Sequence, residues 1–138
     1  MTHVFDDFWH QANVWIKELS EDLGWQDHDR RSLRLLRITM HALRDRVPMT
    51  EALQFAAQLP TILRGIYFER YRPTQTPTDE KTAEEFVEKI EREMNDTALD
   101  QPENQIRIVL TFLNRKITEG EMADIRGAMP KDMERLFA

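Results

Sequence analysis

Residues 43–68 read LRDRVPMTEALQFAAQLPTILRGIYF and residues 113–138 read LNRKITEGEMADIRGAMPKDMERLFA, so the two segments align without a gap at an offset of 70 residues. Few positions are identical, but the apolar positions, one proline and one glutamate keep the same phase. The matched pairs include Pro60 with Pro130, Glu51 with Glu121 and Val47 with Ile117. Self-similarity at a fixed period is typical of duplicated structural units. It predicts how the chain is built without indicating what it does.

Apolar residues recur at spacings of three and four along most of the chain, which is the periodicity of amphipathic helices. On the first predicted helix, Phe5, Phe8, Trp9 and Trp15 fall on the apolar face that we expect to be buried. No segment alternates between apolar and polar residues for long enough to predict a strand. The sequence therefore predicts an all-α fold of about eight helices, arranged as two tandem four-helix repeats that pack with pseudo-two-fold symmetry.

The chain of 138 residues is predicted to form a single domain made of two repeats, residues 1–73 and residues 79–138. Residues 74–78 form the linker. They belong to a segment, residues 72–78, that holds two prolines and otherwise only polar residues, so it should be extended and exposed. Neither repeat is large enough to bury its apolar face well alone. We therefore expect one cooperative unit and not two independent domains.

The composition excludes several classes of protein. There are no cysteines, which excludes a disulfide scaffold, a thiolate metal site and a cysteine nucleophile. No apolar run is long enough for a membrane span, and residues 1–7 lack the features of a signal peptide, so we expect a cytoplasmic protein. Asp6, Asp7 and His10 lie close together, but a metal site needs three or four converging ligands. Neither a metal nor another cofactor is therefore predicted.

Charge is distributed unevenly along the chain. Residues 1–73 hold ten basic and ten acidic residues, whereas residues 74–138 hold nine basic and fifteen acidic residues. The second half therefore accounts for the whole net charge of −6. An acidic surface repels a polyphosphate backbone, so this distribution argues against nucleic-acid binding.

A basic stripe runs along the second predicted helix. Its members follow at steps of four, three, four and three, which places them on one side of a helix: Arg30, Arg34, Arg37, His41 and Arg44. Together with Trp25, which follows the first helix and should be partly exposed, this stripe is a candidate docking surface for a protein with an acidic surface. The alternative is that the arginines pair with acids of the first helix. The sequence does not decide between the two interpretations.

Motifs in both halves resemble a known bacterial family. They are LRDRVP at residues 43–48, AAQLP at residues 56–60 and LRGIYF at residues 63–68, followed by Gly-Glu, Ile-Arg, Met-Pro and Leu-Phe pairs within residues 120–137. The family is the uncharacterised domain of unknown function 2267. The resemblance implies an all-helical, twice-repeated protein with no assigned activity or catalytic residue. This chain departs from the family at residues 68–71, which read FERY where the family tends towards an aromatic pair followed by Gly-Trp.

Two functions from different classes fit these patterns. The first is a small, non-enzymatic interaction or adaptor module, monomeric or homodimeric, that docks through the basic stripe. The second is a small-molecule binding protein or enzyme whose pocket lies at the seam between the repeats, with Arg64, Tyr67, Arg70 and Tyr71 as its polar lining. Arg64 lies among apolar residues, so it should be partly buried and tie the repeats together through a carboxylate or helix carbonyl groups. Because no catalytic set is recognisable, the sequence favours the first function.

Overall fold

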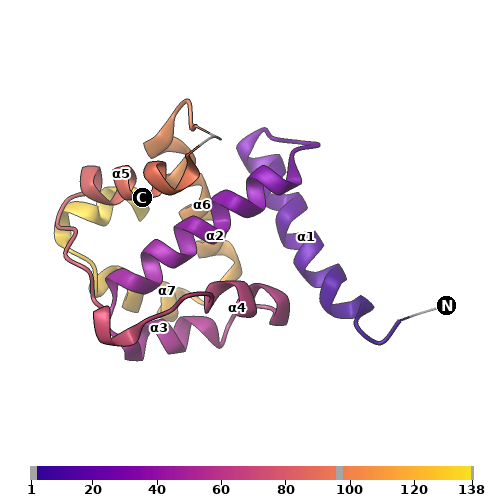
Figure 1. Ribbon diagram of the computed structural model, residues 1–138, viewed down its shortest axis with the longest axis horizontal. Helices are drawn as coiled ribbons and strands as arrows, with labels where there is room; N and C mark the ends of the chain where they lie inside the picture. The colour runs from indigo at the N-terminus through magenta and orange to yellow at the C-terminus, as the bar shows by residue number, and fades with distance from the viewer. Residues whose placement is uncertain (1–2, 96–97, 138) are drawn as a thin grey trace.

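The computed structural model describes residues 3–95 and 98–137, and every regular element within those ranges is helical (Figure 1). The prediction of an all-α fold is therefore confirmed. In chain order the elements are α1 (Asp6–Leu23), α2 (Asp29–Arg46), α3 (Met49–Ala56), α4 (Thr61–Tyr67), the 3₁₀ segment η1 (Pro73–Gln75), α5 (Ala83–Met94), α6 (Pro102–Lys116), α7 (Glu119–Gly127) and the 3₁₀ segment η2 (Lys131–Phe137). The last predicted helix is thus a 3₁₀ segment. Residues 1, 2 and 138, which the predicted repeats include, lie outside the described residues.

Local sequence signals explain where several helices begin and end. α1 ends at Gly24, whose φ of 72° lies in the left-handed region that glycine adopts at little cost. α5 and α7 each follow a threonine whose side chain accepts a hydrogen bond from a backbone N–H three residues later, Thr82 from Glu85 and Thr118 from Glu121. These caps satisfy N–H groups that have no partner within the helix itself.

The bounds of the elements repeat at the offset found in the sequence. α7 begins 70 residues after α3, and η2 begins and ends 70 residues after α4. The packing repeats as well, because α1 contacts α2 and α4, while α5 contacts α6 and η2. The two sets of elements also meet crosswise, α1 against α6 and α5 against α2. Two tandem copies would produce this pattern, and the pseudo-two-fold symmetry itself stays a prediction.

One apolar core runs through both sets of elements. Leu36 of α2 belongs to the same buried cluster as Ile106 of α6. Trp15 of α1 and Phe112 of α6 meet edge-on, with their ring centroids 5.7 Å apart. The ion pairs between α1 and α6 are partly exposed, and such pairs contribute only about 0–1 kcal/mol each. The apolar contacts therefore hold the two halves of the chain together.

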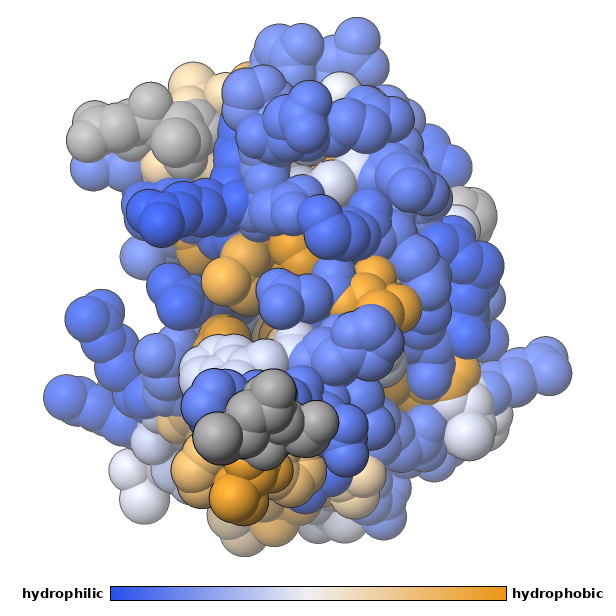
Figure 2. All heavy atoms as spheres, turned by 90° about the vertical axis from the view of Figure 1, so that its right-hand side faces the viewer, coloured by the Kyte–Doolittle hydropathy of each residue, from blue (hydrophilic) through white to orange (hydrophobic). Residues whose placement is uncertain are grey.

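The N-terminal turns of α1 are exposed, which differs from the burial expected of its apolar face. Phe5 is 63% exposed and Trp9 is 56% exposed. Figure 1 shows this end of α1 extending away from the other helices, and Figure 2 shows apolar side chains gathered low on the corresponding face. Periodicity identifies the apolar side of a helix, but it does not show how far along that side other helices cover it. The same face is therefore buried at Ala12, Ile16 and Leu19 and uncovered before them.

The linker contains a turn, in contrast to the extended segment expected from its prolines. Pro73–Gln75 form η1, and Thr78 donates its backbone N–H to the carbonyl oxygen of Asp45 over 2.8 Å. Arg46 donates from Nε to the carbonyl oxygen of Glu80 over 2.7 Å. These bonds hold the segment that leads from α4 to α5 against the C-terminal end of α2.

A substitution in the second half of the chain tests whether the molecule unfolds as one unit. Leu113 is fully buried in α6, so Leu113→Ala should lower the free energy of unfolding by about 2–5 kcal/mol. All the tryptophans lie in the first half of the chain. Urea denaturation followed by tryptophan fluorescence and by circular dichroism should therefore show both transitions moving together to lower urea. Glu88→Ala, an exposed change on α5, is the control, and a fluorescence transition that stays in place would contradict a single unit.

Candidate functional site

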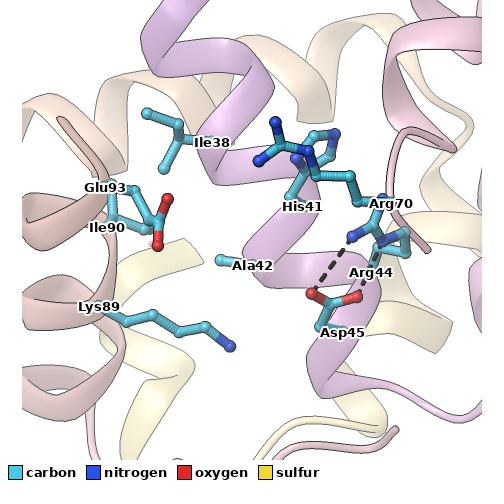
Figure 3. Close-up of a pocket in the computed structure, with 9 residues that line it drawn as sticks. All are labelled: Ile38, His41, Ala42, Arg44, Asp45, Arg70, Lys89, Ile90 and Glu93. Atoms are coloured by element: carbon cyan, nitrogen blue, oxygen red, sulfur yellow. Dashed lines mark hydrogen bonds and ion pairs between the residues drawn. The ribbon is translucent and has the colours of Figure 1, made fainter. Parts of the chain in front are cut away.

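A cleft lies between α2 and α5, two helices that belong to different predicted repeats (Figure 3). Its volume is about 240 Å³, and its lining consists of Ile38, His41, Ala42, Arg44, Asp45, Arg70, Lys89, Ile90 and Glu93. A second hollow of about 270 Å³ shares Ile38, His41, Arg70 and Glu93 with it and adds Arg34, Arg37 and Glu69. Because the two hollows share these walls, we treat them as one site and call it the α2–α5 cleft.

Three elements supply the walls of the α2–α5 cleft. On α2, Ile38 and Ala42 are four residues apart and therefore lie on the same side of the helix, where they form an apolar floor. Lys89 and Glu93 have the same spacing on α5. Arg70 comes from the turn after α4, and its φ of 58° lies in the left-handed region that residues other than glycine rarely adopt. Figure 3 shows Lys89 and Glu93 on one side of the cleft and Arg70 on the other.

Arg44 of the basic stripe is buried and caps the end of α4. Its side chain is 3% exposed, and its Nε lies 2.8 Å from the carboxylate of Asp45. Its Nη1 donates to the carbonyl oxygens of Tyr67 and Glu69, the latter over 2.8 Å. The last carbonyl groups of a helix have no partner within the helix. The guanidinium therefore satisfies acceptors that would otherwise be buried without a hydrogen bond.

The remaining arginines of the basic stripe differ in how they are bound. Arg34 donates to the carbonyl oxygen of Glu93 near the end of α5 over 3.0 Å. Arg37 lies 3.2 Å from the carboxylate of Glu69. Arg30 is exposed and makes no hydrogen bond or ion pair with the residues that the structure describes. Two acids of α1 that could have paired with the stripe bind basic residues of α6 instead.

His41 is half-buried on α2, and its Nε2 lies 2.7 Å from the carbonyl oxygen of Ile66. Burial lowers the pKa of His41 below its ordinary value, although the hydrogen bond to Ile66 acts in the opposite direction. The nearby Arg44 lowers the pKa further. The ring is therefore neutral near pH 7 and, because a carbonyl oxygen can only accept, it carries its proton on Nε2. His41 thus adds no positive charge to the basic stripe.

Trp25 is buried, which differs from the partial exposure expected of it. Only 7% of the residue is exposed. Its backbone N–H donates to the carbonyl oxygen of Ser20 over 2.8 Å, which folds the loop back against the end of α1. The guanidinium carbon of Arg31 lies 3.9 Å from the centroid of the Trp25 ring. The chain's own cation therefore covers a ring that was expected to be available to a partner.

Of the four residues predicted to line a seam pocket, Arg70 alone lines the α2–α5 cleft. Arg64 is exposed where partial burial was expected. It donates to the carbonyl oxygens of Ala56 over 2.9 Å and of Leu59 over 2.8 Å, at the end of α3. These acceptors belong to the same half of the chain, so Arg64 caps a neighbouring helix and its described bonds do not join the two halves.

The two tyrosines of the predicted pocket pack inside the protein. Tyr67 is fully buried, and its hydroxyl donates to the carbonyl oxygen of Ala52 over 2.7 Å. Burial raises the pKa of Tyr67 well above its ordinary value. The ring of Tyr71 faces the guanidinium of Arg44, with 5.0 Å between the guanidinium carbon and the ring centroid. In place of the tyrosines, the structure puts Lys89 and Glu93 at the cleft, which the sequence reasoning missed because no local pattern shows which helix α5 will face.

Most charged side chains of the α2–α5 cleft are already bound by other groups. The lining contains the basic residues Arg34, Arg37, Arg44, Arg70 and Lys89 and the acidic residues Asp45, Glu69 and Glu93. In addition to the contacts above, Lys89 lies 3.0 Å from the carboxylate of Glu80. Arg70 and Glu93 are different: neither side chain makes a hydrogen bond or ion pair with any described residue, including each other. One exposed cation and one exposed anion of the cleft are thus unused by the chain and open to water or to a ligand.

A known protein family covers the part of the chain that forms the cleft. The sequence profile of a family described as an uncharacterized conserved protein, DUF2267, matches residues 12–136. The chain belongs to DUF2267. This match confirms the resemblance drawn from the motifs at residues 43–68. No curated protein matches the chain, and the description of the family names no activity.

Three further observations apply to this DUF2267 protein. No helix among the described residues is long and apolar enough to cross a membrane. Within residues 3–95 and 98–137, no group of three or more histidine, aspartate or glutamate side chains is placed to hold a metal ion. Arg70 lies in the FERY segment at residues 68–71, and its left-handed backbone is one that glycine would adopt most readily.

This DUF2267 protein also buries two acids where α3 meets α7. Glu51 and Glu121 each lie in the first turn of their helix. Oε2 of Glu51 and Oε1 of Glu121 are buried and have no hydrogen-bond partner among the described residues. Burial raises the pKa of Glu121 above its ordinary value, and the negative charges of Glu51 and Asp124 add to the shift. Ionisation of Glu121 therefore works against the packing of α3 on α7.

Removing the Arg44 guanidinium should destabilise the protein. Arg44→Met leaves the carbonyl groups after α4 without a donor and Asp45 without its ion pair. The expected loss is roughly 3 kcal/mol, the lower end of the range for breaking a buried pair, because Asp45 is one-quarter exposed. Urea denaturation measures the loss. Arg30→Met on the exposed end of the same helix should change stability by less than about 0.5 kcal/mol, and equal effects of the two substitutions would contradict the capping role.

Replacing Glu121 should change how stability depends on pH. The folded state holds the Glu121 proton more tightly than the unfolded state does, so stability should fall as the pH rises through the window above the ordinary glutamate pKa. Glu121→Gln should remove this fall and make the protein more stable than the wild type at pH 7 but not at pH 4. Chemical denaturation at both values measures the difference. Glu119→Gln, an exposed change in the same turn, is the control, and an identical gain in both variants would contradict the role of burial.

Proposed function

We propose that this protein is a non-enzymatic binder of a small organic anion, which it holds in the α2–α5 cleft. The observation that carries the proposal is the unpaired guanidinium of Arg70 in the wall of the cleft. A guanidinium presents several N–H donors in a plane and so suits a carboxylate or phosphate group. A ligand with such a group would supply the acceptors that no described residue offers to Arg70.

The backbone of Arg70 supports the proposal. A residue with a β-carbon at φ 58° is strained, and the left-handed region costs roughly 1–2 kcal/mol for most residues. Strained residues persist where the surrounding structure imposes them, and they cluster at binding sites. Here the conformation places a long basic side chain at a recess, where it stabilises no described part of the fold. The cost and the absent partner together favour a role in binding.

The charge of the cleft also favours an anion. Its lining carries five basic and three acidic side chains, whereas the whole chain has a net charge of −6. A recess with a net positive charge on a molecule with a net negative charge raises the local concentration of anionic ligands. An anion is therefore attracted to this cleft in preference to the remaining surface.

The cleft lacks the side chains that most often act as nucleophiles, which supports binding without catalysis. The lining residues include no hydroxyl or thiol group. His41 donates to the carbonyl oxygen of Ile66 and Lys89 pairs with Glu80, so both nitrogen groups have partners within the chain. Glu93 and Nδ1 of His41 are the basic groups that remain in the lining. Without a hydroxyl or thiol group beside them, they form no recognisable catalytic set.

An adaptor that docks an acidic protein through the basic stripe was the function favoured by the sequence. Arg34, Arg37 and Arg44 already hold groups of their own chain. Trp25 is buried, so Arg30 is the part of that surface without a bound partner among the described residues. These contacts make the cleft the better-supported site.

Thermal unfolding with small anions tests the proposal. The melting temperature of the wild-type protein should rise in the presence of at least one of three anions at millimolar concentration: 4-methylpentanoate, succinate or inorganic phosphate. A ligand stabilises the state that binds it. Arg70→Gly should lose that shift and, since glycine relieves the left-handed strain, should remain about as stable as the wild type without ligand. Arg72→Met, an exposed change outside the cleft, should keep the shift. The absence of any shift in the wild type, or an unchanged shift in Arg70→Gly, would overturn the proposal.

A further inference from the structure

The α2–α5 cleft contains an unused anion as well as an unused cation. The carboxylate of Glu93 lines both hollows of the cleft, as the guanidinium of Arg70 does, and it has no partner among the described residues. The other acids of the lining are engaged, Asp45 by Arg44 and Glu69 by Arg37. A ligand with only a negative charge would leave Glu93 without a partner, and the carboxylate of Glu93 would repel it.

We propose that the ligand is a small zwitterion of the amino-acid type, with its carboxylate at Arg70 and its ammonium group at Glu93. This inference rests on the proposed function and names the class of ligand for the same site. The two side chains come from opposite walls, Arg70 from the turn after α4 and Glu93 from α5, and Figure 3 shows them on either side of the cleft. They form no ion pair with each other. A ligand with both charges can satisfy the two walls at once.

The floor of the cleft indicates what lies between the charged groups of the ligand. Ala42 and Ile90 are buried and Ile38 is half-buried, so the surface between the walls is aliphatic. Figure 3 shows Ile38 and Ala42 between the side of Glu93 and the side of Arg70. An aliphatic side chain can displace water from this floor, at about 0.8 kcal/mol for each buried methylene group. The cleft therefore suits a small aliphatic amino acid.

Most charged side chains next to Arg70 and Glu93 are balanced by partners within the chain. Lys89 lies on the same wall as Glu93, but Glu80 lies 3.0 Å from its amino group and balances its charge. On the other wall, the pair of Arg44 and Asp45 is internally balanced. Arg34 binds only the neutral carbonyl oxygens of Glu93 and Met94, so its positive charge also remains. The charges left for a ligand are therefore positive at Arg70 and Arg34 and negative at Glu93. This arrangement disfavours a lone ammonium group most, and it offers a zwitterion one contact for each of its charges.

Isothermal titration calorimetry with three matched probes tests the inference. Leucine carries both charges, 4-methylpentanoate lacks the ammonium group, and 3-methylbutylamine lacks the carboxylate, while all three share the same aliphatic chain. We expect leucine to bind at least about tenfold more tightly than 4-methylpentanoate, because a charged hydrogen bond is lost without the ammonium group. Glu93→Gln should reduce the affinity for leucine to that for 4-methylpentanoate and should not weaken 4-methylpentanoate. Arg70→Met should weaken both ligands.

Glu88→Gln is the matched control, because Glu88 is an exposed acid of α5 outside the cleft and its loss should leave all three affinities unchanged. Equal affinities for leucine and 4-methylpentanoate would overturn the zwitterion and leave the anion-binding function standing. Binding of neither carboxylate would overturn the zwitterion, and it would overturn the anion-binding function as well if succinate and inorganic phosphate also failed to bind. If 3-methylbutylamine bound as tightly as leucine, the role of Arg70 would be wrong. Circular dichroism of each variant confirms that a lost affinity does not reflect a lost fold.

Discussion

The contact between the Arg44 guanidinium and the chain that leaves α4 is the interaction on which the site depends. Arg44 binds the carbonyl oxygen of Glu69, the residue before Arg70, and so positions the turn that holds Arg70. It also pairs with Asp45, whose backbone carbonyl group accepts the N–H of Thr78 in the linker. One buried cation on α2 therefore organises both the turn that forms one wall of the cleft and the segment that leads to the other wall.

The same physical requirement recurs at the ends of other helices. Short helices leave a large share of their carbonyl groups without internal partners, and three of the helices here receive an arginine from elsewhere in the chain. Arg64 serves the end of α3, Arg44 the end of α4 and Arg34 the end of α5. The positive end of each side chain also complements the negative end of the helix dipole. The basic stripe thus has a structural explanation before any partner is considered.

The sequence predicted the helices and their register, because the signals that set them are local. Pro48 and Pro60 precede α3 and α4, and the threonine caps mark α5 and α7. It did not predict which charges would be free. The groups that Arg34 and Arg44 hold are 59 and 23 residues away in the chain, so no helical spacing reveals them. Arg70 was named as part of the polar lining of a pocket at the seam between the predicted repeats. Glu93 was not, because its importance comes from the helix that it faces and from the partner that it lacks.

The two crosswise junctions of the fold differ in their charges. Where α1 meets α6, Glu18 pairs with Lys116 and Asp22 pairs with Arg115, at 2.7 and 2.6 Å. Beside the junction of α5 and α2, Glu93 of α5 and Arg70 of the turn after α4 have no side-chain partner among the residues that the structure describes. Two equivalent halves would offer two equivalent sites, but the ion pairs that bridge one junction make the halves unequal in chemistry. The expected stoichiometry is therefore one ligand per chain.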